Sequence, residues 1–185
     1  MDTWDFTVLL LSAGWSLYLC IRIAHQWQIH KPGEGVAAAV RVFAHPFLLL
    51  FIFQAATGFE NPGSIPLWIH FPGISIFLSG IGMLYAAHRT LGKNYEAAVA
   101  LKNPSALVTT GPYAIMRHPI YFGALLMGIG TELALASPYM LIVILLIPLI
   151  VWQIHREERL LSSVFKDAWA AYKNNTPYKI LPYIF

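Results

Sequence analysis

The chain has 185 residues, of which 57% are hydrophobic and 11% are charged, and its mean hydropathy is +0.59. Because a soluble domain carries about 25% charged residues, this composition excludes a soluble protein and indicates an integral membrane protein. The net charge of +3 does not indicate nucleic-acid binding, since the basic residues lie scattered at the ends of apolar segments. The single Cys20 allows no intrachain disulfide, and no metal site is expected.

Five apolar segments are predicted to cross a membrane as helices, each needing about 20 residues. They cover approximately residues 4–23, 36–57, 67–87, 119–136 and 138–154. The last two belong to one apolar run, which Ser137-Pro138 divides. Residues 155–174 carry apolar side chains at helical spacing and predict a cytosolic or interfacial helix that ends before Pro177. We therefore expect one all-α membrane domain over residues 1–185, with five transmembrane helices and a catalytic half at about 88–185.

The distribution of charge predicts the orientation. Five crossings place the two termini on opposite sides. With the N-terminus outside, all 12 Lys and Arg residues fall on the cytosolic side, as the positive-inside rule requires. The outer segments then carry only acidic residues, which are Asp2, Asp5, Glu60 and Glu132. Glycines of the third and fourth helices are predicted to allow close helix contact, namely Gly73, Gly80, Gly82, Gly123, Gly128 and Gly130.

Two polar clusters lie at the predicted cytosolic ends of helices. Arg117-His118 precedes the fourth helix and Glu157-Glu158 follows the fifth, so the two clusters should meet at the same depth. Polar groups at a membrane edge are costly unless they bind something. The first amide groups of the fourth helix, with Arg117 and His118, favour an anion such as a carboxylate. Glu157 can accept hydrogen bonds from an amine or a ribose, whereas Glu158 is predicted to face water or to pair with a lysine.

Aromatic side chains complete the predicted pocket, which the polar stretch before the fourth helix and the C-terminal helix would form. Tyr113 and Tyr121 offer ring faces to a cation or a flat ring. An anion site, a cation site and an aromatic slot together suit a zwitterionic nucleoside, and S-adenosylmethionine is such a ligand. No Gly-x-Gly-x-x-Gly sequence lies between a predicted strand and a helix, so a dinucleotide fold is not indicated.

Three segments in this order resemble the signature of the isoprenylcysteine carboxyl methyltransferase family. They are Leu107 to Tyr113, Arg117-His118-Pro119-x-Tyr121-x-Gly123 and Glu157-Glu158-x-x-Leu161. The resemblance runs from about residue 90 to the end. Membrane phospholipid N-methyltransferases share the Arg-His-Pro and Glu-Glu elements, and sterol reductases have a more distantly similar C-terminal half. The resemblance implies S-adenosylmethionine as cofactor, with contacts at the matching positions Leu107, Val108, Tyr113, His118, Pro119, Tyr121 and Glu157.

One departure from the family concerns the methyl acceptor. The eukaryotic enzymes carry an arginine one helical turn before the first glutamate, where it is thought to orient the substrate, and this chain has Gln153 there. Arg156 or Arg117 is the predicted substitute. The chain resembles a minimal five-helix core, which implies a monomer in a prokaryotic plasma membrane. Its expected partners are membrane lipid and a lipophilic small molecule or prenylated substrate.

Other activities stay open at this stage. Methylation of a lipid amine would need a base such as Glu157 or His118, because an ammonium must first lose a proton. A NADPH-dependent membrane reductase would need basic side chains for a 2′-phosphate in the polar stretch. A small transporter or scaffold without chemistry would show paired acidic and basic residues in mid-membrane, and the sequence offers no convincing pair.

Overall fold

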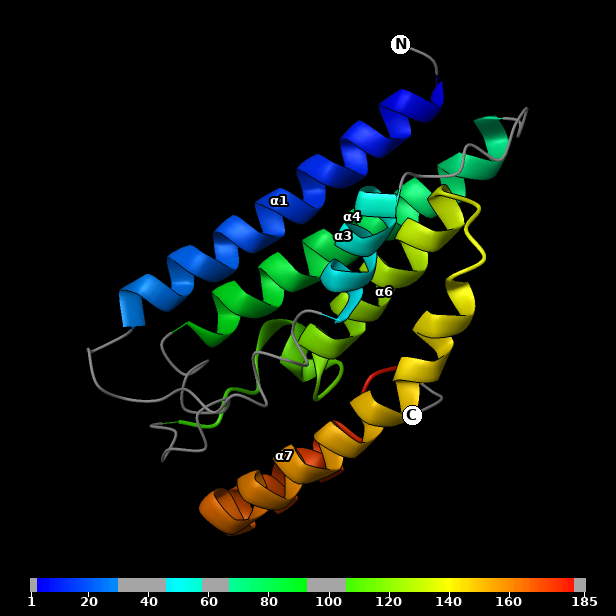
Figure 1. The fold of residues 1–185 in the computed structure, drawn as a ribbon. Coiled ribbons are helices and arrows are strands. Elements are labelled where there is room, and N and C mark those ends of the chain that lie inside the picture. Colours follow the sequence, from blue (N-terminus) through cyan, green and yellow to red (C-terminus); the bar gives the residue numbers. More distant parts are fainter. Residues whose placement is uncertain (1–2, 30–45, 58–66, 93–105, 182–185) are drawn as a thin grey trace.

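The computed structural model describes residues 3–29, 46–57, 67–92 and 106–181. Within these ranges the chain forms five α-helices and one short 3-10 helix (Figure 1). The elements in chain order are α1 (Thr3–Ile29), α3 (Pro46–Thr57), α4 (Leu67–Leu91), η1 (Gly111–Ala114), α6 (Pro119–Ala134) and α7 (Met140–Asn175). The all-α prediction is therefore confirmed for the described part of the chain.

The helices follow the predicted apolar segments. Segments 67–87 and 119–136 correspond to α4 and α6, and segment 4–23 lies inside α1. Of the second predicted segment, 36–57, only the part in α3 belongs to the described residues. By length and composition, α4 from His70 and α7 could each cross a membrane, and α6 is a shorter apolar helix. These features agree with an integral membrane protein.

The antiparallel pair of α4 and α6 forms the centre of the molecule. A Cβ atom added at Gly80 would lie 2.7 Å from the backbone nitrogen of Met127, and one added at Gly123 would lie 2.8 Å from Leu84 Cγ. The two backbones thus approach too closely for larger side chains, as predicted for the glycines. Gly82 is the exception, since a Cβ there would meet open space.

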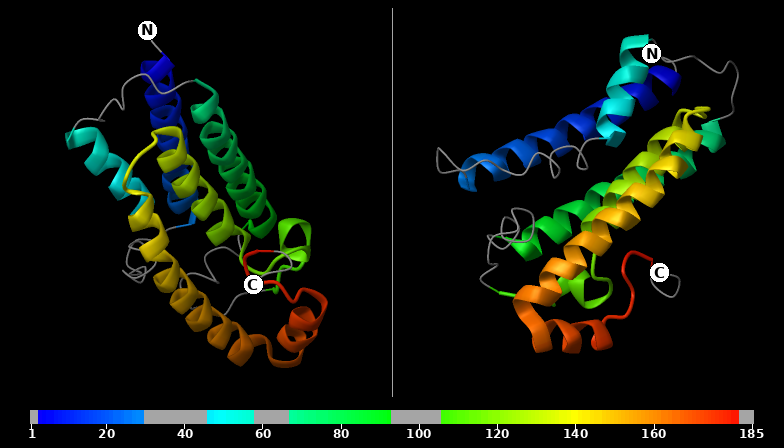
Figure 2. Two further views of the ribbon diagram at one scale, coloured as in Figure 1. Left: turned by 90° about the vertical axis from the view of Figure 1, so that its right-hand side faces the viewer. Right: turned by 60° about the horizontal axis from the view of Figure 1, so that its bottom comes forward.

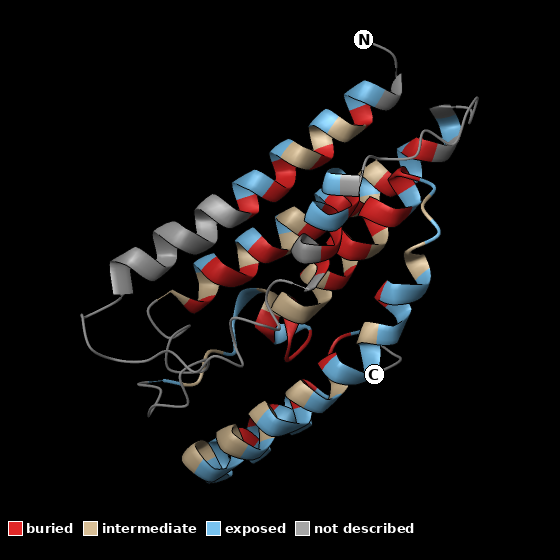
Figure 3. Cartoon of the chain, in the orientation of Figure 1, coloured by how far each residue is buried: buried red, intermediate tan, exposed pale blue. Residues whose placement is uncertain are grey.

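A cluster of aromatic side chains joins α1 and α3 to this pair. Trp15 of α1 stacks on Phe51 of α3, with 6.1 Å between the ring centroids, and its ring lies 6.0 Å from Phe77 of α4. Buried residues gather where α1 and α3 face α4 and α6, whereas the outward side of α7 is exposed (Figure 3). The exposed residues of α7 include Leu141, Leu145 and Leu149, which is the pattern of a lipid-facing helix.

α7 differs from the prediction in its extent. The fifth apolar segment and the first part of the tail form one continuous helical stretch through Ile154, and α7 as a whole consists of two helical stretches that meet at a kink. No helix breaker stands near Ile154, where the sequence predicted a boundary. The interruption lies instead at Lys166, whose φ of 46° and ψ of −112° are not helical. There the chain turns back toward residues 106–118 (Figure 2), and the helix ends before Pro177, as predicted.

Candidate functional site

The start of α6 carries the first polar cluster. Pro119 is the first residue of α6, a position that suits its fixed φ and its missing N–H. Arg117 and His118 precede it and are only 8% and 5% exposed. Because α4 and α6 are antiparallel, this cluster lies beside the C-terminal end of α4.

The segment before α6 is fitted tightly against α4. Gly111 has a φ of +58°, and a Cβ there would lie 2.8 Å from Thr90 Oγ1, so both conformation and space require glycine. The following turn buries Tyr113 against Ala87 and Leu91 of α4. Burial raises the pKa of the Tyr113 hydroxyl, and the nearby charge of Glu157 acts in the same direction. Tyr113 is therefore neutral at physiological pH.

The second polar cluster comes from α7 and meets the first. Arg117 Nε donates to Glu158 Oε1 at 2.8 Å, and His118 Nε2 lies 3.3 Å from the same oxygen. On the other side of the imidazole, His118 Nδ1 lies 3.8 Å from Glu157 Oε2. The structure thus brings together Arg117, His118 and Glu157, which are separated by about 40 residues of sequence, and it adds Glu158.

The two glutamates have opposite electrostatic environments. Burial alone would raise the pKa of Glu158, but hydrogen bonds from His118 and Arg117, together with their charges, outweigh it and bring the pKa to about 2. Burial raises the pKa of Glu157, against the charge of His118 and a hydrogen bond from Tyr121. Glu158 is therefore a fixed negative charge, whereas burial favours the neutral form of Glu157, whose opposing charge comes from His118.

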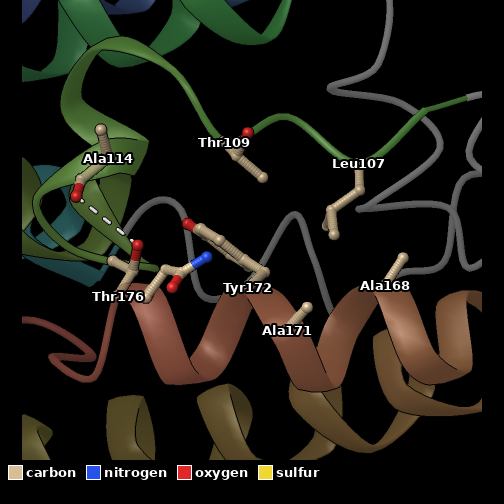
Figure 4. Close-up of a pocket in the computed structure, with 8 residues that line it drawn as sticks. Leu107, Thr109, Ala114, Ala168, Ala171, Tyr172 and Thr176 are labelled. Atoms are coloured by element: carbon tan, nitrogen blue, oxygen red, sulfur yellow. Dashed lines mark hydrogen bonds between the residues drawn. The ribbon is translucent and has the colours of Figure 1, made fainter.

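Figure 4 shows a pocket of about 550 Å³ between residues 107–114 and the C-terminal end of α7. Leu107, Thr109 and Ala114 line it on one side, and Ala168, Ala171, Tyr172, Asn175 and Thr176 line it on the other. Two hydrogen bonds join the sides, from Tyr172 Oη to the carbonyl of Tyr113 at 2.7 Å and from Thr176 Oγ1 to the carbonyl of Ala114 at 3.5 Å. The carbonyl of Thr176 also accepts from Arg117, so pocket and cluster share a wall.

The remaining predicted residues occupy different positions. Val108 packs against the small cluster of Ala87, Leu91 and Tyr113, and the ring of Tyr121 lies 5.9 Å from that of His118. Arg156 is exposed, with its guanidinium 4.8 Å from the ring of Trp152, and it does not join the cluster. Gln153 lies one helical turn before Glu157, and its buried Oε1 has no hydrogen-bond partner among the described residues.

Sequence reasoning missed several residues of this region. Glu158 was predicted to face water or to pair with a lysine, but its partners are Arg117 and His118, and its side chain is 15% exposed. Neighbouring residues on a helix point about 100° apart, and the sequence does not fix the rotation of α7. The C-terminal helix was expected to form part of the pocket, but none of its pocket-lining residues was predicted individually. Ala168 and Tyr172 belong to the apolar positions from which this cytosolic or interfacial helix was predicted.

Comparison with known proteins covers the same region. The family model described as phospholipid methyltransferase matches residues 68–168, more than half of the chain. This match contains α4, α6, both polar clusters and most of α7.

Individual relatives carry several kinds of name. The chain is 27% identical over 187 residues to protein-S-isoprenylcysteine O-methyltransferase of Schizosaccharomyces pombe, which covers 95% of this chain and 70% of the relative. It is 29% identical over 117 residues to protein-S-isoprenylcysteine O-methyltransferase B of Arabidopsis thaliana, covering 60% of this chain and 58% of the relative. It is also 30% identical over 111 residues to Delta(14)-sterol reductase of Arabidopsis thaliana, covering 51% of this chain and 30% of the relative. The chain thus spans less than two thirds of the length of both Arabidopsis proteins.

Proposed function

The chain belongs to the phospholipid methyltransferase family, and we propose that it is an S-adenosylmethionine-dependent membrane methyltransferase. Its acceptor is a lipophilic carboxylate, as in isoprenylcysteine carboxyl O-methylation. The observation that carries the proposal is the convergence of Arg117, His118, Glu157 and Glu158 beside a pocket. The names of the fission yeast and the first Arabidopsis relative support the same activity.

The residues present fit this cofactor. A pocket of about 550 Å³ lies within the range of roughly 300–1,000 Å³ for small-molecule sites. Leu107 and Ala171 would cover a purine ring, and Thr109 and Asn175 offer polar groups to a ribose. Glu157 would face the positive charge of the ligand, which would favour the ionised form of this buried carboxyl group. When bound, S-adenosylmethionine supplies an electrophilic methyl group on a sulfonium.

The contribution of the protein to the reaction is mainly positional. A carboxylate acceptor is ionised at neutral pH and needs no general base. The protein must then align the acceptor and exclude water. Gln153, which stands where the eukaryotic enzymes carry an arginine, is better placed to orient the acceptor than either predicted substitute. It lies on the face of α7 that carries Glu157 and has a buried oxygen without a partner among the described residues. Arg156 would have to leave the ring of Trp152 to take part.

A lipid amine is the second candidate acceptor. The family model is that of phospholipid methyltransferases, and Gln153 Oε1 could accept a hydrogen bond from an N–H group. An amine must lose a proton before it attacks, so Glu157 or His118 would then serve as base. With a carboxylate acceptor, activity stays constant above about pH 5, because a carboxyl group with a pKa near 4 is already ionised. A steep rise toward alkaline pH would favour the amine.

The proposed placement is a prokaryotic plasma membrane, crossed five times by a monomer with an outer N-terminus and a cytosolic C-terminus. The directions of the helices support the proposed number of crossings, since α1, α4 and α7 run one way and α6 runs the other way (Figures 1 and 2). Single cysteines at Glu60 and at Lys173, in a Cys20→Ser background, can be labelled in sealed vesicles. Labelling of both positions from the same side would rule out this topology.

Titration calorimetry in detergent tests the cofactor assignment. S-Adenosylhomocysteine should bind, whereas NADPH should not. His118→Ala and Glu157→Ala should each weaken the binding of S-adenosylhomocysteine by about 1–3 kcal/mol, as for the loss of a buried polar partner. The control is Arg159→Ala, an exposed position of α7 outside the pocket. Unchanged affinity in both site variants would contradict the site, and binding of NADPH alone would favour the reductase.

A further inference from the structure

Arg117 is held by the protein itself. Its Nε donates to Glu158 at 2.8 Å, and its Nη1 donates to the carbonyls of Thr176 and Pro177 at 2.6 and 2.7 Å. The side chain is 6% exposed. A guanidinium with three protein acceptors in two different segments is poorly available to a substrate carboxylate, and its planar donors suit this bridging geometry.

The segment after α7 lies along the start of α6. The backbone N–H of Arg117 donates to the carbonyl of Tyr178 at 2.9 Å, and that of His118 donates to the carbonyl of Lys179 at 2.8 Å. Ile180 is 4% exposed and belongs to the main hydrophobic core. Residues 176–181, the return segment, are therefore attached to the site by backbone bonds, by the Arg117 side chain and by one apolar anchor.

This attachment determines how the site presents its histidine. Glu158 Oε1 accepts a hydrogen bond from Arg117 Nε and also contacts His118 Nε2. Arg117 therefore holds in place the carboxylate that orients the imidazole. With Nε2 directed at Glu158, the ring directs Nδ1 toward Glu157, 3.8 Å away. Thr176, whose carbonyl Arg117 holds, is also a wall of the pocket.

We propose that Arg117 is a positioning residue, which latches the return segment to Glu158 and so holds the pocket wall and the His118 ring in place. This inference rests on the proposed function for its effect on the cofactor. It differs from the sequence-based expectation that Arg117 orients the acceptor. Lysine cannot replace the latch, because an ammonium has no fork of planar donors that spans Glu158 and two carbonyls.

The test combines Arg117→Lys with Ile180→Ala, which removes only the apolar anchor. Arg117→Lys should weaken the binding of S-adenosylhomocysteine about tenfold, as for the loss of a hydrogen bond to a charged group. Ile180→Ala should weaken it in the same direction, because it releases the return segment from the core. If the latch works through the return segment, the double variant should lose less than the product of the single effects. The KM for the acceptor at saturating cofactor should not change. Arg159→Lys, an exposed position on α7, is the matched control.

Limited trypsin digestion gives a readout that does not depend on the cofactor. Cleavage after Lys179, followed by intact mass, should be faster in Arg117→Lys and in Ile180→Ala than in the parent chain and in the control. A raised acceptor KM with unchanged cofactor affinity would overturn the inference, as would unchanged proteolysis. If the parent chain binds no S-adenosylhomocysteine, the proposed function fails, whereas the digestion still decides whether Arg117 secures the return segment.

Discussion

Polar side chains are buried at both ends of α6, but the two ends differ in the kind of contact that these side chains make. At the C-terminal end, Gln54 Nε2 donates to Glu132 at 2.8 Å, and Trp15 Nε1 donates to Thr131 at 3.1 Å. His70 Nδ1 lies 2.6 Å from the carbonyl of Ala134. These contacts tie α3, α1 and α4 to α6. None of these residues lines the pocket.

The N-terminal end of α6 concentrates charge instead. Two carboxylates from α7 face one arginine and one histidine, and the cluster adjoins a pocket. Burial of polar groups is therefore not what distinguishes a site in this bundle, because most buried polar groups in proteins are paired for structural reasons. The distinguishing features are the accumulated charge, the opposite pKa shifts of two adjacent carboxyl groups and the nearby pocket.

The largest expected effect is that of Glu158→Ala. The variant leaves the Arg117 guanidinium buried without its carboxylate, which should lower the free energy of unfolding by about 3 kcal/mol. Thermal unfolding in detergent, followed by tryptophan fluorescence, measures it. Glu158→Gln keeps a hydrogen-bond acceptor and should lose less. If both variants were as stable as the parent chain, the ion pair of Arg117 and Glu158 would not contribute to the stability of the fold.

Acidification should act through the same carboxylate. The pKa of Glu158 is about 2 in the folded chain and 4.5 ordinarily, so its stabilisation is complete above about 4.5 and is lost as the pH falls toward 2. The shift corresponds to about 3 kcal/mol. Glu157 has a raised pKa and contributes with the opposite sign, so the comparison belongs in a Glu157→Gln background. There, Glu158→Gln should flatten the fall in melting temperature between pH 5 and 3; an equal fall in both chains would contradict the assignment.

A smaller effect is expected at the other end of α6. Glu132→Ala removes the acceptor of the Gln54 hydrogen bond and should lower the free energy of unfolding by about 1–3 kcal/mol. The affinity for S-adenosylhomocysteine should not change, since Glu132 is separated from the cluster by the length of α6. Glu132→Gln preserves a hydrogen bond and serves as the control. A loss of cofactor affinity without a loss of stability would remove the distinction between the two ends.

Much of this arrangement follows from the sequence. The apolar runs predict α4 and α6, because turn residues bound the first and Pro119 begins the second. Because α6 and α7 are antiparallel, the start of α6 lies at the same membrane depth as the part of α7 that follows its apolar run. The proximity of His118 and Glu157 was therefore also predictable. The glycines at positions 80 and 123 predict the close contact of α4 with α6.

Other features have no comparable signal. The rotation of α7, which decides whether Glu157 or Glu158 meets Arg117, depends on packing that a stripe of apolar residues only approximates. The return segment is held largely through backbone carbonyls, which every residue type offers equally. The turn of α7 lies at Lys166, neither a glycine nor a proline, so the sequence rules for helix ends do not find it.

The kink at Lys166 is a further difference between the two ends of α6. The pocket beside the N-terminal end of α6 depends on the kink, whereas the contacts at the C-terminal end do not. A φ of 46° with a ψ of −112° is unfavourable for a residue with a Cβ atom. Such strain costs on the order of 1–3 kcal/mol. Lys166→Gly should therefore raise the free energy of unfolding by about 1 kcal/mol, or about 2–4 °C in melting temperature, whereas Lys166→Ala keeps the Cβ and should gain nothing. Cofactor affinity should be unchanged, since Lys166 is exposed and lies outside the pocket lining. If glycine instead destabilised the chain by about 1 kcal/mol, as it does inside a regular helix, the helix would be unstrained at this position.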